Sequence, residues 1–165
     1  MDNKVSIYDV GEKKKLGDTS SLRGRDDTTG ENFQGGKKNE KVVQHDNFVM
    51  DILPIPEINY IASASMDASL CLWNIDTLKG VRKLEGHKKG IYCLEYYSPS
   101  NLILSAGVDH EIFVWNPIVE GKIFTLTGHN HSLVGVKWLK GTNQLVSADI
   151  SGMFKIWDVR NFTPI

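Results

Sequence analysis

The chain has 165 residues, 41% of them hydrophobic, and a formal net charge of −1, which is compatible with one ordinary domain. A charge so close to zero argues against a protein that is steered to nucleic acid by its bulk charge. No apolar run approaches the roughly 18 residues of a membrane span, and residues 1–10 contain no apolar signal-peptide core. Cys71 and Cys93 lie in strand-like runs and are interpreted as reduced, buried residues. These features predict a cytoplasmic protein.

The first two segments differ in composition. Within residues 1–10, Val5 to Val10 alternates apolar and polar side chains like a strand, and we interpret it as the remnant of an incomplete repeat. Residues 11–41 are rich in Gly, Lys, Asp, Thr, Ser and Asn. Such a segment buries too little apolar surface to offset its ordering entropy, so we predict a disordered low-complexity insertion.

Residues 42–165 read as short strands separated by turn residues. The predicted strands fall into three groups, at about 44–84, 86–126 and 128–165. Each of the first two groups holds four strands, and the third holds three before the chain stops. The predicted strands are 48–53, 60–64, 70–73 and 81–84; then 91–96, 102–106, 112–115 and 122–126; then 133–139, 144–148 and 153–157.

The three groups are tandem repeats. Trp73, Trp115 and Trp157 follow one another at intervals of 42 residues, and a histidine and a serine recur at the same interval. The period lies within the roughly 40–45 residues of a propeller blade that carries Gly-His and Trp-Asp signatures. The chain resembles the WD40-repeat family from about Val42 to Val159. This resemblance implies an all-β fold, a partial propeller with three near-complete four-stranded blades and an N-terminal relic. Because four blades need about 16 strands, we expect an open arc or one completed by assembly.

The recurring serines, histidines and aspartates could suggest a Ser-His-Asp hydrolase. We reject this interpretation because a catalytic triad occurs once per site and because no Gly-x-Ser-x-Gly elbow is present. The resemblance instead implies structural tetrads, in which the Trp N–H donates to Ser, Ser donates to His, and His donates to Asp. The predicted tetrad residues are His45, Ser63, Asp67 and Trp73; His87, Ser105, Asp109 and Trp115; and His129, Ser147 and Trp157. In the third repeat the Asp position is Ser151, and Asp149 is the available substitute.

If the tetrads are structural, function falls to the surface loops. In WD40 proteins, partners often bind the face where the first strand of each blade begins. Six apolar residues map to turn and bulge positions on that face, and we predict that they bind a protein partner: Met50, Met66, Tyr92, Val108, Val134 and Ile150. The alternative is that several of them pack between blades.

The leading functional interpretation is a non-catalytic interaction scaffold that uses no cofactor, small-molecule substrate or metal. Two alternatives stay open. One is a nucleic-acid or phosphate-binding module that uses Arg82, Lys88 and Lys89, and the other is a non-catalytic part of a larger enzyme complex. The His129-Asn-His131 sequence lacks a third metal ligand nearby. Self-assembly is a further expectation, because it would complete the propeller.

The second and third repeats also resemble WD-repeat proteins of ciliated cells that often carry EF-hands. The residues that suggest this are Trp-Asn-Pro at 115–117 and Ser-Ala-Asp-x-Ser-Gly at 147–152. The resemblance implies a ciliary or cytoskeletal scaffold. Because the chain has no EF-hand loop, calcium binding is not implied.

Overall fold

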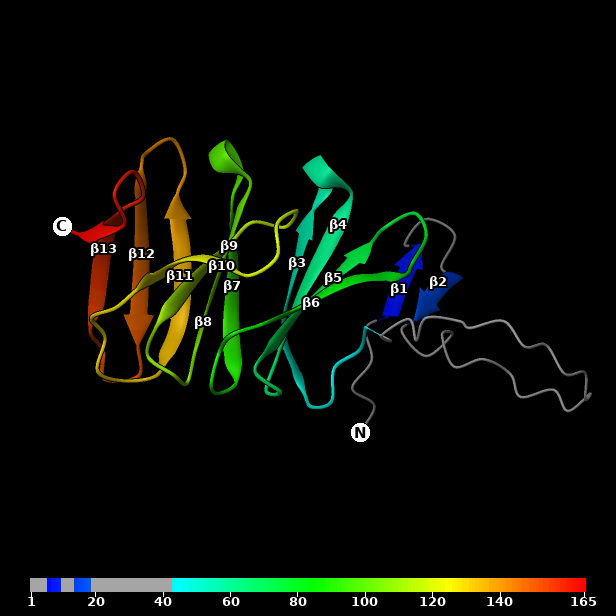
Figure 1. Ribbon diagram of the computed structural model, residues 1–165, viewed down its shortest axis with the longest axis horizontal. Coiled ribbons are helices and arrows are strands. Elements are labelled where there is room, and N and C mark those ends of the chain that lie inside the picture. Colours follow the sequence, from blue (N-terminus) through cyan, green and yellow to red (C-terminus); the bar gives the residue numbers. More distant parts are fainter. Residues whose placement is uncertain (1–5, 10–13, 19–42) are drawn as a thin grey trace, which may run out of the picture.

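A computed structural model describes residues 6–9, 14–18 and 43–165 (Figure 1). Three four-stranded antiparallel sheets, here called the first, second and third blades, stand next to one another as an open arc. The first blade contains β3 (Val49–Ile55), η1 (Pro56–Ile58), β4 (Tyr60–Ser65), β5 (Ser69–Asn74) and β6 (Gly80–Glu85). The second contains β7 (Ile91–Tyr97), η2 (Ser98–Ser100), β8 (Leu102–Gly107), β9 (Ile112–Trp115) and β10 (Lys122–Leu126). The third contains β11 (Leu133–Leu139), β12 (Gln144–Asp149), β13 (Phe154–Asp158) and β14 (Thr163–Pro164). The all-β, partial-propeller prediction is confirmed.

The N-terminal part differs from the sequence-based expectation. β1 (Ser6–Asp9) pairs antiparallel with β2 (Lys14–Asp18). β2 lies inside the stretch 11–41 that we expected to be a disordered insertion. Backbone pairing needs no apolar side chain, which is why a Lys- and Gly-containing segment can form a strand without a hydrophobic signal. The other residues of 1–10 and 11–41 lie outside the described residues.

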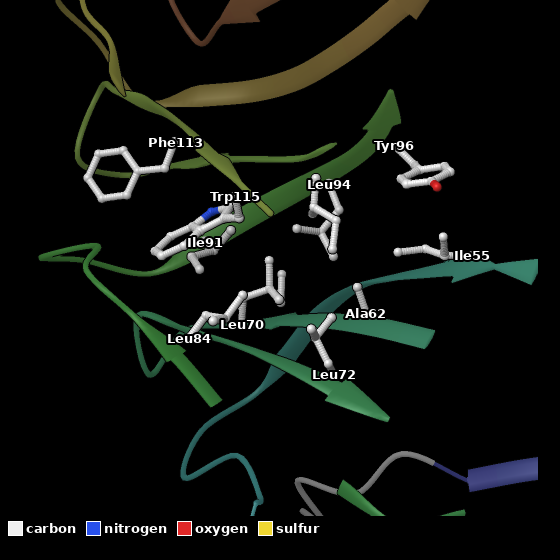
Figure 2. Packing of buried hydrophobic residues seen from close by; sticks show 12 residues of the cluster. Ile55, Ala62, Leu70, Leu72, Leu84, Ile91, Leu94, Tyr96, Phe113 and Trp115 are labelled. Carbon is white, nitrogen blue, oxygen red and sulfur yellow. The ribbon is translucent and has the colours of Figure 1, made fainter. Parts of the chain in front are cut away.

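The blades are joined by apolar side chains that point from one sheet to the next. Between the first and second blades, Leu70 and Leu72 of β5 pack in one cluster with Ile91, Leu94 and Trp115, and all five are buried (Figure 2). The alternation of each strand sends one set of residues toward the preceding blade and the other toward the following blade. Each sheet therefore buries both faces only if it has a neighbour on each side.

The second and third blades meet in the same way. Leu104, Ile112 and Val114 of the second blade cluster with Leu145 and Trp157 of the third. Ile112 and Val114 occupy the positions that Leu70 and Leu72 occupy one 42-residue period earlier. The repeat in the sequence is thus a repeat of the packing between blades.

One face of the third blade is not covered by the described residues. Phe154 and Ile156 lie one period after Ile112 and Val114. Whereas Ile112 and Val114 are fully buried, Phe154 is 67% exposed and Ile156 is half-buried. The arc therefore ends in an apolar sheet surface of the kind that promotes association.

The end of the blades where β3, β7 and β11 begin also carries the turns β4–β5, β8–β9 and β12–β13; it is called the loop face below and lies along the lower edge of Figure 1. Each turn is attached to the loop before the first strand of its blade. Val108 N–H donates to the Gly90 carbonyl at 2.9 Å, and Ile150 N–H donates to the Ser132 carbonyl at 3.0 Å. A Cβ atom at Gly107 would lie 2.1 Å from the Gly90 carbonyl oxygen, so only glycine allows this approach in the second blade.

Candidate functional site: three buried networks and the loop face

The second blade contains three linked hydrogen bonds, which run from Trp115 of β9 to Asp109 in the β8–β9 turn on the loop face. Trp115 Nε1–H donates to Ser105 Oγ at 2.7 Å, and Ser105 donates to His87 Nε2 at 2.6 Å. The other ring nitrogen of His87, Nδ1, donates to Asp109 Oδ2 at 2.6 Å. His87 also stacks on Phe113, with ring centroids 4.0 Å apart. These bonds connect the loop before β7, strands β8 and β9, and the turn between them.

The directions of these bonds follow from the donor and acceptor chemistry. The indole nitrogen can only donate, and an ionised carboxylate can only accept. When the His87 proton is on Nδ1, Nε2 accepts from the serine, and this tautomer gives the serine hydroxyl proton an acceptor. Every side-chain nitrogen and hydroxyl of this network then has a hydrogen-bond partner, as burial requires.

The first blade repeats this network with one additional hydroxyl. Trp73 donates to Ser63 at 2.8 Å, Ser63 donates to His45 Nε2 at 2.7 Å, and His45 Nδ1 lies 3.1 Å from Asp67 Oδ2. Ser69 donates to Asp67 Oδ1 from its hydroxyl at 2.5 Å and from its backbone N–H at 2.9 Å. Burial opposes ionisation of Asp67, but the hydrogen bonds from Ser69 and from the Asp46 backbone N–H, together with the nearby His45, outweigh it and lower the pKa of the carboxyl to about 2. Burial lowers the pKa of His45 despite the nearby Asp67 carboxylate.

The third blade builds its network with Asp149. Trp157 donates to Ser147 at 2.8 Å, Ser147 donates to His129 Nε2 at 2.7 Å, and His129 Nδ1 donates to Asp149 Oδ2 at 2.7 Å. Ser151, which stands at the usual aspartate position, donates to Asp149 Oδ1 at 2.6 Å. Hydrogen bonds from Ser151 and then from His129 hold the pKa of Asp149 well below its usual range. Relative to the tryptophan of the blade, this aspartate and this serine both lie two positions earlier than Asp67 and Ser69 do in the first blade.

The second network has one unsatisfied atom. Asp109 Oδ1 is buried and has no hydrogen-bond partner among the described residues. The residue two positions after the aspartate is a serine in the other two blades, Ser69 and Ser151, but Glu111 in the second blade. A glutamate cannot supply the hydroxyl proton that this oxygen accepts in the other blades.

The burial and bonding of the three serines favour a structural role over nucleophilic catalysis. Ser63, Ser105 and Ser147 are completely or almost completely buried. Each serine oxygen accepts an indole N–H and gives its own proton to the histidine, so it lies between two side chains of the same blade. A nucleophile must instead reach a substrate carbonyl, and these three hydroxyls are buried in their blades.

The six residues predicted to bind a partner differ in exposure. Met50, Val134 and Ile150 are 45%, 51% and 64% exposed. Met66, Tyr92 and Val108 are half-buried. Met66 is half-buried because its side chain fills the space between the first and second blades. A Cβ atom added at Gly90 of the second blade would lie 2.6 Å from the Met66 sulfur. Met50 of the first blade and Val134 and Ile150 of the third blade are therefore exposed apolar side chains, and at least Met66 of the other three also contributes to blade packing.

Two exposed apolar residues of the loop face did not appear among the six predicted residues. Phe48 lies next to Met66, because its carbonyl accepts the Met66 N–H at 2.9 Å. Met153 closes the β12–β13 turn, where its carbonyl accepts the Asp149 N–H. The available signal was that both are large apolar residues at the edge of a predicted turn. With Met50, Val134 and Ile150, they bring to five the exposed large apolar residues named here on the loop face.

The basic residues considered for nucleic-acid binding do not act together. Arg82 donates to the Ile118 carbonyl at 2.7 Å, on the side of the second blade away from the loop face. Lys88 and Lys89 are exposed on the loop face. Within residues 6–9, 14–18 and 43–165, no group of three or more His, Cys, Asp or Glu side chains is placed to hold a metal ion. The described part of the chain also has no helix of the length and apolarity needed to cross a membrane.

Comparison with known proteins agrees with this geometry. The family described as WD domain, G-beta repeat matches residues 36–74, 78–116 and 121–158, which is more than half of the chain. The coatomer subunit beta′ of Rattus norvegicus is 40% identical over 55 residues, 33% of this chain and 6% of that protein. The same subunit of Drosophila melanogaster is 39% identical over 54 residues, so the match spans only a small part of these relatives.

The crystal structure of RRP9 WD40 repeats superposes with a TM-score of 0.70 at 22% identity, over 74% of this chain and 39% of that one. At this identity the similarity establishes the fold alone. The three repeat matches and the blade architecture together show that the chain belongs to the WD40-repeat family.

Proposed function

We propose that the chain is a non-catalytic scaffold whose loop face binds a segment of another protein. The observation that supports this most directly is the exposure of Met50, Val134 and Ile150 at strand-start and turn positions, where polar residues are usual. Exposed apolar side chains gathered at one end of a rigid sheet stack are typical of a partner surface. The WD40 family is generally one of protein-interaction domains, which is consistent with this function.

The experiment compares matched pairs of apolar-to-acid substitutions. The test variant carries Val134→Asp and Ile150→Asp on the loop face. The control carries Ile118→Asp and Val119→Asp, which are similarly exposed but follow β9 at the opposite end of the blade. Proteins that bind the immobilised wild-type chain should also bind the control and should be lost from the test variant. Equal capture by both variants would rule out the loop face as the binding surface, provided that all three chains melt alike.

The assembly to which the scaffold belongs and its cellular location are also proposals. The curated relatives named above are subunits of coatomer, so a place for this chain within a multi-protein assembly is consistent with them. We propose a cytoplasmic location, and the ciliary or cytoskeletal complex stays a prediction. Imaging of a fluorescent fusion in ciliated cells tests both locations. Signal confined to a compartment other than the cytoplasm would contradict the cytoplasmic location, and diffuse signal without ciliary enrichment would contradict the ciliary complex.

We also propose that the uncovered face of the third blade binds a second copy of the chain. The corresponding faces of the first and second blades are each covered by another blade, whereas Phe154 is largely exposed. Light scattering of the wild-type chain should give a mass well above the 18.5 kDa of one copy. A Phe154→Asp variant should return to the mass of one copy. A wild-type chain that is monomeric would contradict this proposal.

A further inference from the structure

β1 and β2 repeat the pairing of the two outer strands of a blade. Tyr8 of β1 pairs with Lys15 of β2, as Trp73 of β5 pairs with Gly80 of β6. In both pairs of strands the register shifts at the same step, immediately before Tyr8 and immediately before Trp73. β9 and β10 of the second blade also shift at this step. Because β1 and β2 match two blades in register and in irregularity, they have the backbone pattern of the outer half of a blade.

One edge of β1 is not paired with any described strand. In the three blades the third strand, which is β5, β9 or β13, pairs with a strand on each side, whereas β1 and β2 form a two-stranded sheet. The backbone groups along the other edge of β1 can therefore pair with an added strand. A two-stranded sheet is also marginally stable by itself in water, so an added strand would stabilise it.

One part of the first blade is not covered by the described residues. Ile52 of β3 is 51% exposed, whereas Leu94 and Val136, which follow it at intervals of 42 residues, are 1% and 0% exposed. Toward the outer strands the same side of the blade is covered, because Trp73 is 2% exposed and packs with Val43. Figure 1 draws β1 and β2 beyond β5 and β6, on the side of the first blade away from the second. The opening at Ile52 therefore lies where the inner strands of a fourth blade would stand.

We propose that β1 and β2 are the outer half of a fourth blade and that a β-hairpin of another polypeptide supplies the inner half. The second strand of this hairpin would pair with the free edge of β1. Its first strand would lie beside β3, with apolar side chains against Ile52 and the exposed Pro54. Strand addition of this kind gains affinity from main-chain hydrogen bonds and specificity from alternate side chains.

The inner hairpins of the described chain do not fill this place themselves. β3–β4, β7–β8 and β11–β12 each pair with the third strand of their own blade. The hairpin must therefore come from outside the three blades. The proposed site is also separate from the loop face and from the uncovered face of the third blade, so it does not depend on the functions proposed for them.

Fluorescence anisotropy of labelled peptides with the full chain tests the site. The probe is a peptide of residues 128–149, which holds the inner hairpin of the third blade. The control peptide carries Leu145→Pro and Val146→Pro, which remove ladder donors from its second strand. The probe should bind roughly tenfold more tightly than the control peptide, because the control loses main-chain hydrogen bonds. Equal binding of the two peptides would overturn the proposal.

Substitutions in the chain locate the binding of the probe. Ile52→Asp should lower the affinity for the probe roughly tenfold, because the hairpin would cover this half-exposed side chain. The matched control is Ile123→Asp, since Ile123 is 52% exposed but lies on β10 of the second blade, and it should bind the probe like wild type. Equal loss of affinity in the two variants would overturn the proposal.

A fused chain tests the same place without depending on the affinity of a free peptide. A copy of residues 128–149 is placed directly before Met1. If Tyr8 takes the position of Trp157, residues 1–4 span the turn that residues 150–153 span in the third blade. This fusion should melt about 5 °C or more above the same fusion with the two prolines in the added copy. Equal Tm values would overturn the proposal.

Two other results would assign the place to a different occupant and would also overturn the proposal. If the probe binds only after residues 20–41 are replaced by a Gly-Ser linker of the same length, that segment of the chain occupies the site. If the probe dissociates the self-associated wild-type chain, a second copy occupies it. Self-association that persists with the probe bound and is lost in Phe154→Asp would support both proposals, because it places the two contacts on different surfaces.

Discussion

The unsatisfied oxygen of Asp109 predicts a substitution that stabilises the chain. In the first blade, Ser69 gives two hydrogen bonds to the corresponding oxygen of Asp67. The backbone of the second blade can present a serine in the same way, because His110 has a φ of 67° and the equivalent Ala68 has 65°. Glu111→Ser should therefore supply the missing donor.

The size of the effect follows from the charge of the acceptor. A hydrogen bond to a charged group contributes about 1.5–3 kcal/mol, and part of this is offset by fixing the serine rotamer. We expect a net gain of about 1–2 kcal/mol, which for a chain of this length raises Tm by about 2–8 °C. Urea titration followed by tryptophan fluorescence measures the free energy of unfolding, and scanning calorimetry measures Tm.

Glu111→Ala is the control, because it removes the same glutamate but brings no hydroxyl. If the serine variant is no more stable than the alanine variant, the gain does not come from a bond to Asp109 and the reasoning about the second network is refuted. If both are less stable than wild type, the Glu111 side chain itself stabilises the turn.

Two other predictions concern the networks. Ser147→Ala leaves its tryptophan and histidine partners unpaired in the interior, so the free energy of unfolding should fall by about 2–4 kcal/mol in urea titration; a loss below about 0.5 kcal/mol would contradict the role of this hydroxyl. Stability should also decrease as the pH falls below 6.5, because burial lowers the pKa of His45 and the unfolded chain takes up the proton first. A further loss should follow between pH 3.8 and about 2, where Asp67 becomes protonated only in the unfolded state. Urea titrations across this pH range measure both losses, and a flat profile would contradict them.

The blades were predictable because their signal is periodic. A tryptophan, a serine and a histidine recur at one interval, and this interval aligns β5, β9 and β13 even where the side chains between them differ. β10 begins and ends where it was predicted. β3 continues through Pro54 to Ile55, beyond the predicted end, because a proline can occupy a strand edge that donates no ladder bond there.

The remaining features depend on three-dimensional detail. The paired shift of Asp149 and Ser151 preserves the network, although the repeat alignment alone shows only a missing aspartate. The unsatisfied oxygen of Asp109 requires atomic positions. The exposure of the six apolar loop residues depends on how closely two blades approach each other, as Met66 and Gly90 do. The residue pattern of one strand does not predict that distance.

The central claim is that the recurring serine, histidine and aspartate side chains serve the fold. Exchange of the indole N–H protons, followed by NMR, tests this most directly. The indole protons of Trp73, Trp115 and Trp157 donate to buried serines, whereas that of Trp138 donates to the Thr142 carbonyl at an exposed turn. We predict slow exchange for the first three and fast exchange for Trp138. Exchange of the three tetrad indoles as fast as that of Trp138 would contradict the account, because the networks would then be open to water.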